Sequence, residues 1–329
     1  MAFSDLTGNA AVVARLKRLV SSGKLPRSLI FFGRAGVGKV EAAVTLAQAL
    51  NCVVSENDAC GLCPSCARIA KDAHADVRVL RPEGRGGQLR AEGVRDAIAE
   101  IPFRPFEGRR RVIIVADAER MNPTTANTLL KTLEEPPPWA TLILVTANEA
   151  ALLPTILSRC QIFRFSPLAP EELEALLVAR HALTPDRAAL LAAVAGGGIA
   201  RALSLRDEPL FELRQQALSI SALALASTTA EELVPLADGL SKDSRLMLLL
   251  DLLLSILRDL TAKKAGAGIL HRDIESEIEA LAGRAPLDLW LEAFALAEEV
   301  VVDLRDRYLN KRISLSKLLL SFQELALRR

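Results

Sequence analysis

Five short runs of β-type residues alternate with helical patterns in the first half of the chain. They lie at residues 29–32, 77–80, 112–115, 142–145 and 162–165. Several of these runs are apolar at every position, as expected for strands of a parallel sheet whose two faces are both covered by helices. The helix before the fourth run is marked by Asn122 as a cap, by Pro123 in its first turn and by Pro136 after its end. The alternation predicts an α/β domain built on a parallel sheet.

Strand patterns stop after the fifth run, and the rest of the chain is helical. Residues 167–207 form a small helical module that is interrupted at 196–198 by three glycines, and residues 208–329 are helical throughout. A chain of 329 residues is long enough for three domains. We therefore expect an α/β domain at 1–166 and two helical domains at 167–207 and 208–329.

One helix of the last region has an unusual pattern at residues 246–261. Its polar residues recur at three-to-four spacing: Asp251, Ser255, Arg258 and Asp259. This spacing predicts a helix with one narrow wet stripe that is otherwise buried all round.

The balance of charge excludes several classes of function. The chain has 41 Lys and Arg against 40 Asp and Glu, so its formal net charge of +1 gives the whole molecule no attraction to nucleic acid or anionic lipid. Only 4% of the residues are aromatic, which argues against a surface that stacks bases of single strands. The amino terminus has no basic region followed by an apolar stretch, and no apolar segment is long enough to cross a bilayer. We expect a soluble, cytoplasmic protein with no membrane partner.

A glycine-rich segment follows the first predicted strand directly. Residues 33–39 read Gly-Arg-Ala-Gly-Val-Gly-Lys and precede a helical pattern. Gly33, Gly36 and Gly38 allow backbone amides to curl around phosphate oxygens, and Lys39 can reach the outer phosphates. The segment predicts a phosphate-binding loop; the alternative is a glycine-rich turn before a helix.

Two parts of a hydrolytic site are missing around this loop. Val40 stands where Ser or Thr would hold magnesium, and Ala118 stands after the third run where an Asp-Glu pair would place its catalytic carboxylate. A loop that holds phosphate without magnesium is a poor catalyst. We predict no hydrolysis, and the sequence leaves open whether ATP or ADP is retained, since Lys39 and the glycines are present.

Four of the five cysteines crowd into one segment. They are Cys52, Cys60, Cys63 and Cys66. Two Cys-x2-Cys turns suit tetrahedral coordination, so we predict a structural zinc ion with no open position for a substrate. The alternatives are an iron–sulfur cluster, for which the ferredoxin pattern would need a cysteine where Ala70 stands, and free thiols. His74 lies near as a substitute ligand, and we interpret it instead as a surface residue.

Arg159 lies just before the fifth predicted strand. It is either an ordinary surface residue or, beside a degenerate phosphate loop, a cation that reaches a nucleotide bound to an adjacent subunit. In the second case Ser158 and Cys160 would help to fix its position, with Cys160 as a small buried group.

These features resemble the delta-prime family of subunits of bacterial DNA polymerase III clamp loaders, which are AAA+ proteins. The resemblance covers roughly residues 3–205. It is carried by residues 25–29, by the cysteine module, by residues 127–137 and by Ser158-Arg159-Cys160. It implies an AAA+ P-loop domain at 1–166 with a zinc module at about 52–66, a three-helix lid at 167–207, and an all-α collar at 208–329 that joins a five-membered ring.

The resemblance also implies roles for individual residues. Arg159 matches the arginine finger that acts in trans on ATP held by a neighbouring ATPase subunit. Thr146 falls at the first sensor position and Arg201 at the second. Beside Val40 and Ala118, a structural role for these two residues is the alternative to monitoring nucleotide.

The function that the resemblance implies is that of a non-hydrolysing clamp-loader subunit. Its partners would be gamma or tau ATPase subunits and delta, and through the complex the sliding clamp and primer–template DNA in a nucleoid-associated replisome. The alternative is an active ATPase of the gamma or tau type, against which Val40 and Ala118 argue. A third hypothesis is DNA binding through Arg109, Arg110 and Arg111, for which we prefer the interpretation of a solvated turn.

Overall fold

The computed structural model describes residues 2–6, 8–82, 89–226, 229–305 and 309–328. These residues belong to two compact units. The first unit comprises Met1–Leu168 and Gly197–Arg201, and the second comprises Ala169–Gly196 and Ala202–Arg329. The finer division of the helical part into a lid at 167–207 and a collar at 208–329 stays a prediction.

The first unit is built on a five-stranded sheet in which every pair of neighbours is parallel. The strands are β1 (Ser28–Phe32), β2 (Val77–Leu80), β3 (Arg111–Val115), β4 (Ala140–Thr146) and β5 (Gln161–Arg164). Their order across the sheet is β2-β3-β4-β1-β5, so the strand that leads into the glycine-rich segment has neighbours on both sides. The predicted parallel α/β fold is confirmed.

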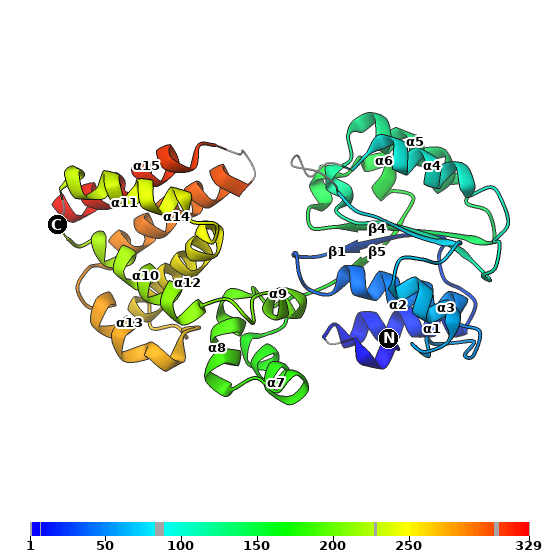
Figure 1. Cartoon of the computed structure of the whole chain (residues 1–329), viewed down its shortest axis with the longest axis horizontal. Coiled ribbons are helices and arrows are strands. Elements are labelled where there is room, and N and C mark those ends of the chain that lie inside the picture. Colours follow the sequence, from blue (N-terminus) through cyan, green and yellow to red (C-terminus); the bar gives the residue numbers. More distant parts are fainter. Residues whose placement is uncertain (1, 7, 83–88, 227–228, 306–308, 329) are drawn as a thin grey trace. The chain divides into compact units, whose positions relative to one another are not determined.

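Helices cover both faces of this sheet (Figure 1). On one face lie α1 (Ala10–Ser21), α2 (Lys39–Asn51) and α3 (Pro64–Ala70), and on the other lie α4 (Ala91–Glu100), α5 (Pro123–Glu134) and α6 (Pro154–Leu157). Successive residues of β1 serve the two cores in turn, because side chains alternate along a strand: Leu29 and Phe31 pack on the first face and Ile30 on the second. Burial of Leu29, Ile30 and Phe31 between the two layers of helices explains the apolar run of β1.

Helix α5 begins and ends where its sequence predicts. Asn122 accepts a hydrogen bond from the Thr125 N–H through its side-chain oxygen (2.8 Å), and Pro123 is the first helical residue. The helix ends at Glu134, before the prolines that cannot continue it. Short 3-10 helices complete the unit at η1 (Phe3–Asp5), η2 (Ala118–Arg120) and η3 (Glu149–Ala151).

The second unit is helical in its described residues. Its helices are α7 (Pro170–His181), α8 (Pro185–Val194), α10 (Leu210–Leu223), α11 (Ala230–Lys242), α12 (Leu246–Lys264), η4 (Arg272–Ile274), α13 (Glu275–Ala282), α14 (Leu287–Arg305) and α15 (Lys311–Leu327). Helix α9 (Ile199–Ser204) begins in the first unit and ends in the second.

Helix α12 differs from its prediction. Its polar stripe is not wet along its length, because Ser255 and Asp259 are buried. The Asp259 carboxylate accepts the backbone N–H of Leu270 (2.9 Å) and of His271 (2.8 Å), and the Ser255 hydroxyl forms a hydrogen bond with His271 Nε2 (2.9 Å). The prediction was wrong for these two residues because the periodicity does not show that a loop packs over the polar side chains and satisfies them.

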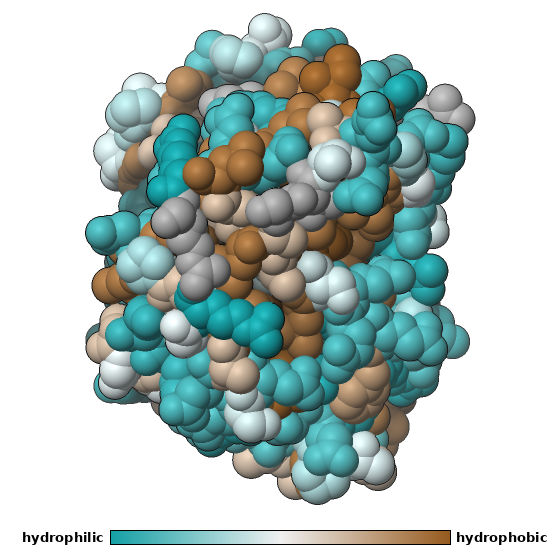
Figure 2. Space-filling view, turned by 90° about the vertical axis from the view of Figure 1, so that its left-hand side faces the viewer, coloured by the Kyte–Doolittle hydropathy of each residue, from teal (hydrophilic) through white to brown (hydrophobic). Residues whose placement is uncertain are grey.

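Apolar side chains also reach the surface of the second unit. Figure 2 shows apolar residues in brown gathered between polar residues in teal. Large exposed apolar side chains of this unit include Leu291, Leu309, Ile313 and Leu327. Over the described residues, no helix combines the length and the hydropathy that a membrane span requires.

Candidate functional site

The glycine-rich segment joins the carboxyl end of β1 to the amino terminus of α2. Gly36 and Gly38 have φ values of +80° and +88°, a left-handed conformation that favours glycine. The loop is anchored at its start, where the Gly33 N–H donates to the carbonyl oxygen of Thr146 on β4 (3.3 Å). The loop therefore lies at the carboxyl edge of the sheet with a helix amino terminus behind it, as phosphate binding requires.

A second segment of the first unit packs directly on this loop. A Cβ atom added to Gly198 would lie 2.6 Å from the Gly36 carbonyl oxygen, so the two backbones are in contact. The Arg201 Cβ lies 3.0 Å from the position that a Cβ on Gly36 would occupy. The structure thus places Arg201, the residue predicted for the second sensor position, against the loop.

Lys39 is turned into the loop that it follows. Its Nζ donates to the carbonyl oxygens of Gly33 (2.6 Å) and Arg34 (2.7 Å), and the side chain is buried. Burial lowers the pKa of the Lys39 ammonium, and the carboxylates of Glu119 and Asp117 act in the opposite direction. A bound phosphate would have to compete with two carbonyl oxygens for this cation.

The two positions that lack catalytic groups are packed against apolar side chains. Val40 is half-buried against the core on one face of the sheet, and Ala118 is buried in the core on the other face. Sequence reasoning missed the acidic residues that flank Ala118. Glu119 accepts the Ala147 N–H at Oε1 (3.1 Å), and its Oε2 is buried without a hydrogen-bond partner in the described part of the chain. The signal that could have found them is a pair of carboxylates, Asp117 and Glu119, soon after a buried strand.

Thr146 uses its hydroxyl within its own turn. The Oγ1 donates to the Asn148 carbonyl oxygen (3.0 Å) and accepts the Asn148 N–H (3.1 Å), and the side chain is buried. Thr146 pairs with Phe32, the last residue before the loop. The structure therefore brings Thr146, the residue predicted for the first sensor position, to the loop, with a hydroxyl that stabilises the end of β4.

Arg159 interacts with α5 and α6. Its Nη1 donates to the Thr155 carbonyl oxygen (2.9 Å) and to the Ser158 hydroxyl (3.3 Å), and its Nη2 donates to Glu134 Oε1 (2.6 Å). About a third of the side chain stays exposed (32%). The neighbouring Cys160 is half-buried, and burial raises the pKa of its thiol to about 12, so the group stays neutral.

The four clustered cysteines converge on one point between α2 and α3. The sulfur atoms of Cys52, Cys60, Cys63 and Cys66 all lie within 4.8 Å of one another. The Cys52 and Cys63 sulfurs are 3.9 Å apart, close to the separation of about 3.8 Å that zinc–sulfur bonds of about 2.3 Å give in a tetrahedron. The donor set and its geometry fit a structural zinc ion.

Backbone N–H groups support these sulfurs as acceptors. Ser55 N donates to Cys52 (3.3 Å), Cys63 N to Cys60 (3.3 Å) and Cys66 N to Cys63 (3.4 Å). Burial opposes ionisation of Cys63, but N–H donors from Cys66 and Val53 outweigh it and lower the pKa of this thiol to about 6. Burial raises the pKa of Cys66 to about 12, so a cation is the natural partner for a fully ionised set.

His74 is not a surface residue, and this interpretation was wrong. The imidazole is buried, with Nε2 against the Ser65 hydroxyl (3.1 Å) and Nδ1 accepting the Asp76 N–H (3.1 Å). Burial lowers its pKa. His74 serves the packing behind α3 rather than the cysteine cluster, because both ring nitrogens have other partners.

The three consecutive arginines before β3 all hold parts of the fold. Arg109 donates to Cys52 O (2.6 Å), Arg110 to Pro138 O (3.1 Å), and Arg111 to Asp76 Oδ1 (3.0 Å). The Arg111 guanidinium is mostly buried against the buried Asp76. The interpretation as a solvated turn was therefore wrong for Arg111, because a buried carboxylate needs a cation or several N–H donors.

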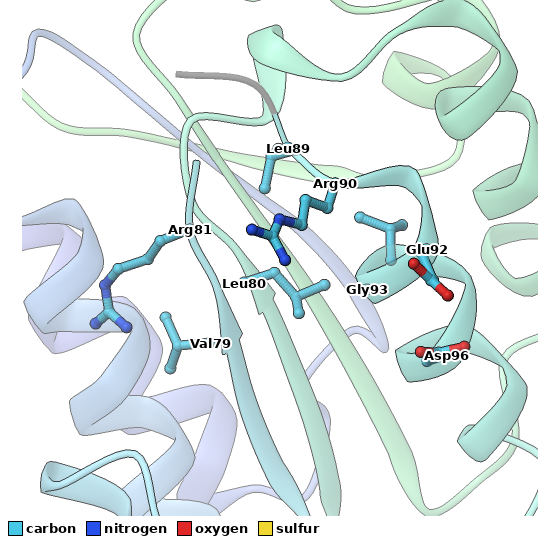
Figure 3. Close-up of a pocket in the computed structure, with 9 residues that line it drawn as sticks. Val79, Leu80, Arg81, Leu89, Arg90, Glu92, Gly93 and Asp96 are labelled. Carbon is cyan, nitrogen blue, oxygen red and sulfur yellow. The ribbon is translucent and has the colours of Figure 1, made fainter. Parts of the chain in front are cut away.

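A separate pocket of about 300 Å³ lies where β2 ends and α4 begins (Figure 3). It is lined by Val79, Leu80, Arg81, Leu89, Arg90, Glu92, Gly93, Val94 and Asp96. Arg90 extends over Leu80, whereas Glu92 and Asp96 project from α4. Of the described residues that line this pocket, none belongs to the predicted loop, sensor, finger or metal groups, and the charges of both signs balance. The candidate nucleotide site therefore stays at the loop.

A glycine-rich loop joins β1 to α2, and β1 lies between β4 and β5 in a parallel β2-β3-β4-β1-β5 sheet, which is the P-loop fold of AAA+ proteins. Within this class, residues 8–169 match the profile of a family described as DNA polymerase III, delta subunit. This match covers just under half of the chain, so residues 8–169 are similar to this family of DNA polymerase III subunits.

The individual relatives include a tau subunit and a delta' subunit of DNA polymerase III. Over 212 residues the chain is 34% identical to DNA polymerase III subunit tau of Escherichia coli, which covers 63% of this chain and 32% of the relative. Over 210 residues it is 30% identical to subunit delta' of Bacillus subtilis, covering 64% and 63%. The matches span about a third to just under two thirds of these relatives. A solved structure of a gamma subunit-related protein from Thermotoga maritima is 19% identical, with a TM-score of 0.46 and coverage of 95% and 99%.

Proposed function

We propose that the chain is a non-hydrolysing, delta-prime-type subunit of a clamp loader. In this proposal it assembles with gamma or tau ATPase subunits and delta, and the complex loads the sliding clamp onto primer–template DNA. Arg159 then acts in trans, stabilising charge on the phosphoryl group of ATP that a neighbouring subunit holds.

The observation that carries the proposal is the contrast between two cations. Lys39 is buried and bonded to two carbonyl oxygens of its own loop, and the adjacent Val40 offers no oxygen to magnesium. Arg159 keeps about a third of its side chain exposed (32%). The first arrangement disfavours hydrolysis within the chain, and the second leaves a cation available to another subunit.

The exposed apolar side chains of the second unit support a role for this unit in assembly. Permanent interfaces are large and apolar, and Figure 2 shows such side chains reaching the surface between polar ones. In the proposal the collar at 208–329 makes the lasting ring contact, and Thr146 and Arg201 have structural roles beside the loop.

The rival function is an active ATPase of the gamma or tau type. It is favoured by the match to the Escherichia coli tau subunit and by the carboxylates of Asp117 and Glu119, whose charges act on Lys39. Phosphate release by the purified chain with magnesium separates the two functions. We expect background rates that Lys39→Ala does not change. Brisk turnover that Lys39→Ala abolishes would establish the rival.

A further inference from the structure

The Arg159 guanidinium is held at both of its ends by different elements. Helix α6 supplies the Thr155 carbonyl oxygen to Nη1 (2.9 Å), and the last residue of α5, Glu134, supplies Oε1 to Nη2 (2.6 Å). A contact at one end would leave the long side chain free to swing about that point. Contacts at two ends fix the plane of the guanidinium as well as its position.

These contacts leave part of the cation available. An arginine carries five N–H donors, and the contacts to Thr155, Ser158 and Glu134 do not engage the Nε donor. Half of the Glu134 side chain (50%) is exposed, so the pair lies at the surface. Surface ion pairs contribute little to folding stability. The pair of Arg159 and Glu134 is therefore better explained by a role other than stabilising the fold.

We propose that Glu134 is a positioning residue for Arg159 in phosphoryl transfer on the neighbouring subunit. This inference rests on the proposed function. The carboxylate touches neither nucleotide nor transferred phosphoryl group. It restricts the rotamers of the arginine before the subunits meet, so less conformational freedom is lost when the finger engages charge that develops in the transition state.

The chain offers a matched control one residue further on. Glu135 carries the same side chain, and its backbone N–H donates to the Lys131 carbonyl oxygen (3.3 Å). Its carboxylate has no hydrogen bond or ion pair within the described residues. A general effect of negative charge at the end of α5 would appear in both positions, whereas positioning of Arg159 requires Glu134 alone.

The test uses the reconstituted complex with gamma or tau ATPase subunits and delta. Its DNA-stimulated ATPase is measured with Glu134→Ala, Glu134→Gln, Glu135→Ala and Arg159→Ala in this chain. We expect Glu134→Ala to lower kcat by about 10-fold to 100-fold, the scale of a misplaced catalytic group, with KM unchanged. Glu134→Gln retains an oxygen acceptor and should recover most of kcat, and Glu135→Ala should match the unchanged chain. The Tm of the isolated chain should be the same for all four variants.

The outcomes separate this inference from the function on which it rests. If Arg159→Ala lowers kcat while Glu134→Ala does not, the trans role of Arg159 is supported and the positioning role of Glu134 is overturned. A rise in kcat for Glu134→Ala would also overturn it, because the carboxylate would then compete with phosphate for the guanidinium. If Arg159→Ala itself leaves kcat unchanged, the trans role fails and the positioning role fails with it.

Discussion

The glycine-rich loop and the segment around Arg159 each carry a cation, but one cation is buried and the other is partly exposed. Lys39 is buried and donates to Gly33 and Arg34 of its own loop. Arg159 lies at the surface, where Glu134 and Thr155 hold it with part of its side chain exposed. The glycine-rich loop thus has the backbone of a nucleotide site, but its own carbonyl oxygens bind the Lys39 ammonium. The segment around Arg159 leaves its cation accessible at the surface.

The difference teaches how to separate groups that serve the fold from groups that serve a partner. A buried ionisable group must be satisfied within the chain, so its loss acts on stability. An exposed cation in a surface ion pair contributes little to folding stability. We therefore expect its loss to affect the partner that it contacts.

Loss of Arg159 should have the largest effect. It should lower the ATPase activity of the complex without changing the stability of the isolated chain. We expect Arg159→Ala to lower the ATP turnover of the reconstituted loader by about 10³-fold, the scale of arginine fingers that act in trans. The Tm of the isolated chain should not change. ATPase assays and thermal unfolding of the same preparations measure both quantities.

Arg164→Ala is the control for charge on this surface. Arg164 lies five residues after Arg159, is also exposed and pairs with Glu149 (2.6 Å). Loader activity with this variant should equal that of the unchanged complex. Equal losses of loader activity for Arg159→Ala and Arg164→Ala would show a general electrostatic effect and would contradict a specific role for Arg159.

Removal of zinc should have the next largest effect, on stability of the first unit. Helix α2 begins with Lys39 and is tied near its far end to the cysteine cluster, where the Gln48 side chain donates to the Cys66 carbonyl oxygen (2.8 Å). Structural zinc contributes directly to folding. We expect Cys63→Ser, or a strong chelator, to lower the Tm by about 10 °C or more.

Metal content of the purified chain, measured by elemental analysis, accompanies this prediction. One zinc per chain is expected, and Cys160→Ser should keep both the zinc and the Tm within a few degrees because Cys160 lies outside the cluster. Iron in the purified protein, or a chain without metal whose Tm ignores Cys63→Ser, would contradict the assignment.

Much of the fold could be predicted from the sequence because its signals are local. The strands follow from apolar runs, and α5 follows from Asn122, Pro123 and the prolines after Glu134. The convergence of the four cysteines follows from their short spacing. In each case the residue types themselves carry the signal, through their own pattern and spacing along one short segment.

Features that depend on which neighbours pack against a polar side chain could not be predicted. The burial of His74 depends on Ser65 and Asp76, and that of Asp259 depends on a loop eleven or twelve residues away. The inward turn of Lys39 depends on loop conformation rather than on its motif. Sequence patterns show which side chains are polar and do not show which neighbours satisfy them.

Buried His271 should make the second unit sensitive to acid. Burial lowers its pKa from 6.5 to about 4, and the side chain is only 1% exposed. Because the unfolded chain takes up the proton first, the stabilisation is complete above about pH 6.5 and is lost as the pH falls toward 4. The loss amounts to about 3 kcal/mol of the free energy of unfolding, at about 1.4 kcal/mol per pH unit.

Denaturant unfolding of the unchanged chain and of His271→Gln between pH 4 and pH 7 measures this effect. The variant should be less stable at pH 7, and its free energy of unfolding should fall less steeply with acid. His181→Gln is the control, because His181 is exposed at the end of α7. Burial raises the pKa of the neighbouring Asp259, an opposing effect that both chains share. Parallel pH profiles for all three proteins would contradict the assignment of acid sensitivity to His271.

A hydroxyl introduced at position 40 should have the smallest effect, and it tests the loop that carries the buried Lys39. Val40→Thr supplies an oxygen for magnesium in the first turn of α2, so we expect ATP affinity to rise about 10-fold when magnesium is present, equivalent to about 1.4 kcal/mol. Phosphate release should stay at background, because Ala118 still offers no carboxylate. Titration of a fluorescent ATP analogue with and without magnesium measures the affinity, and Val40→Ala controls for loss of the valine. If Val40→Thr and Val40→Ala bind equally, the bonds from Lys39 to Gly33 and Arg34 are what close the loop to nucleotide, and the absent hydroxyl is secondary.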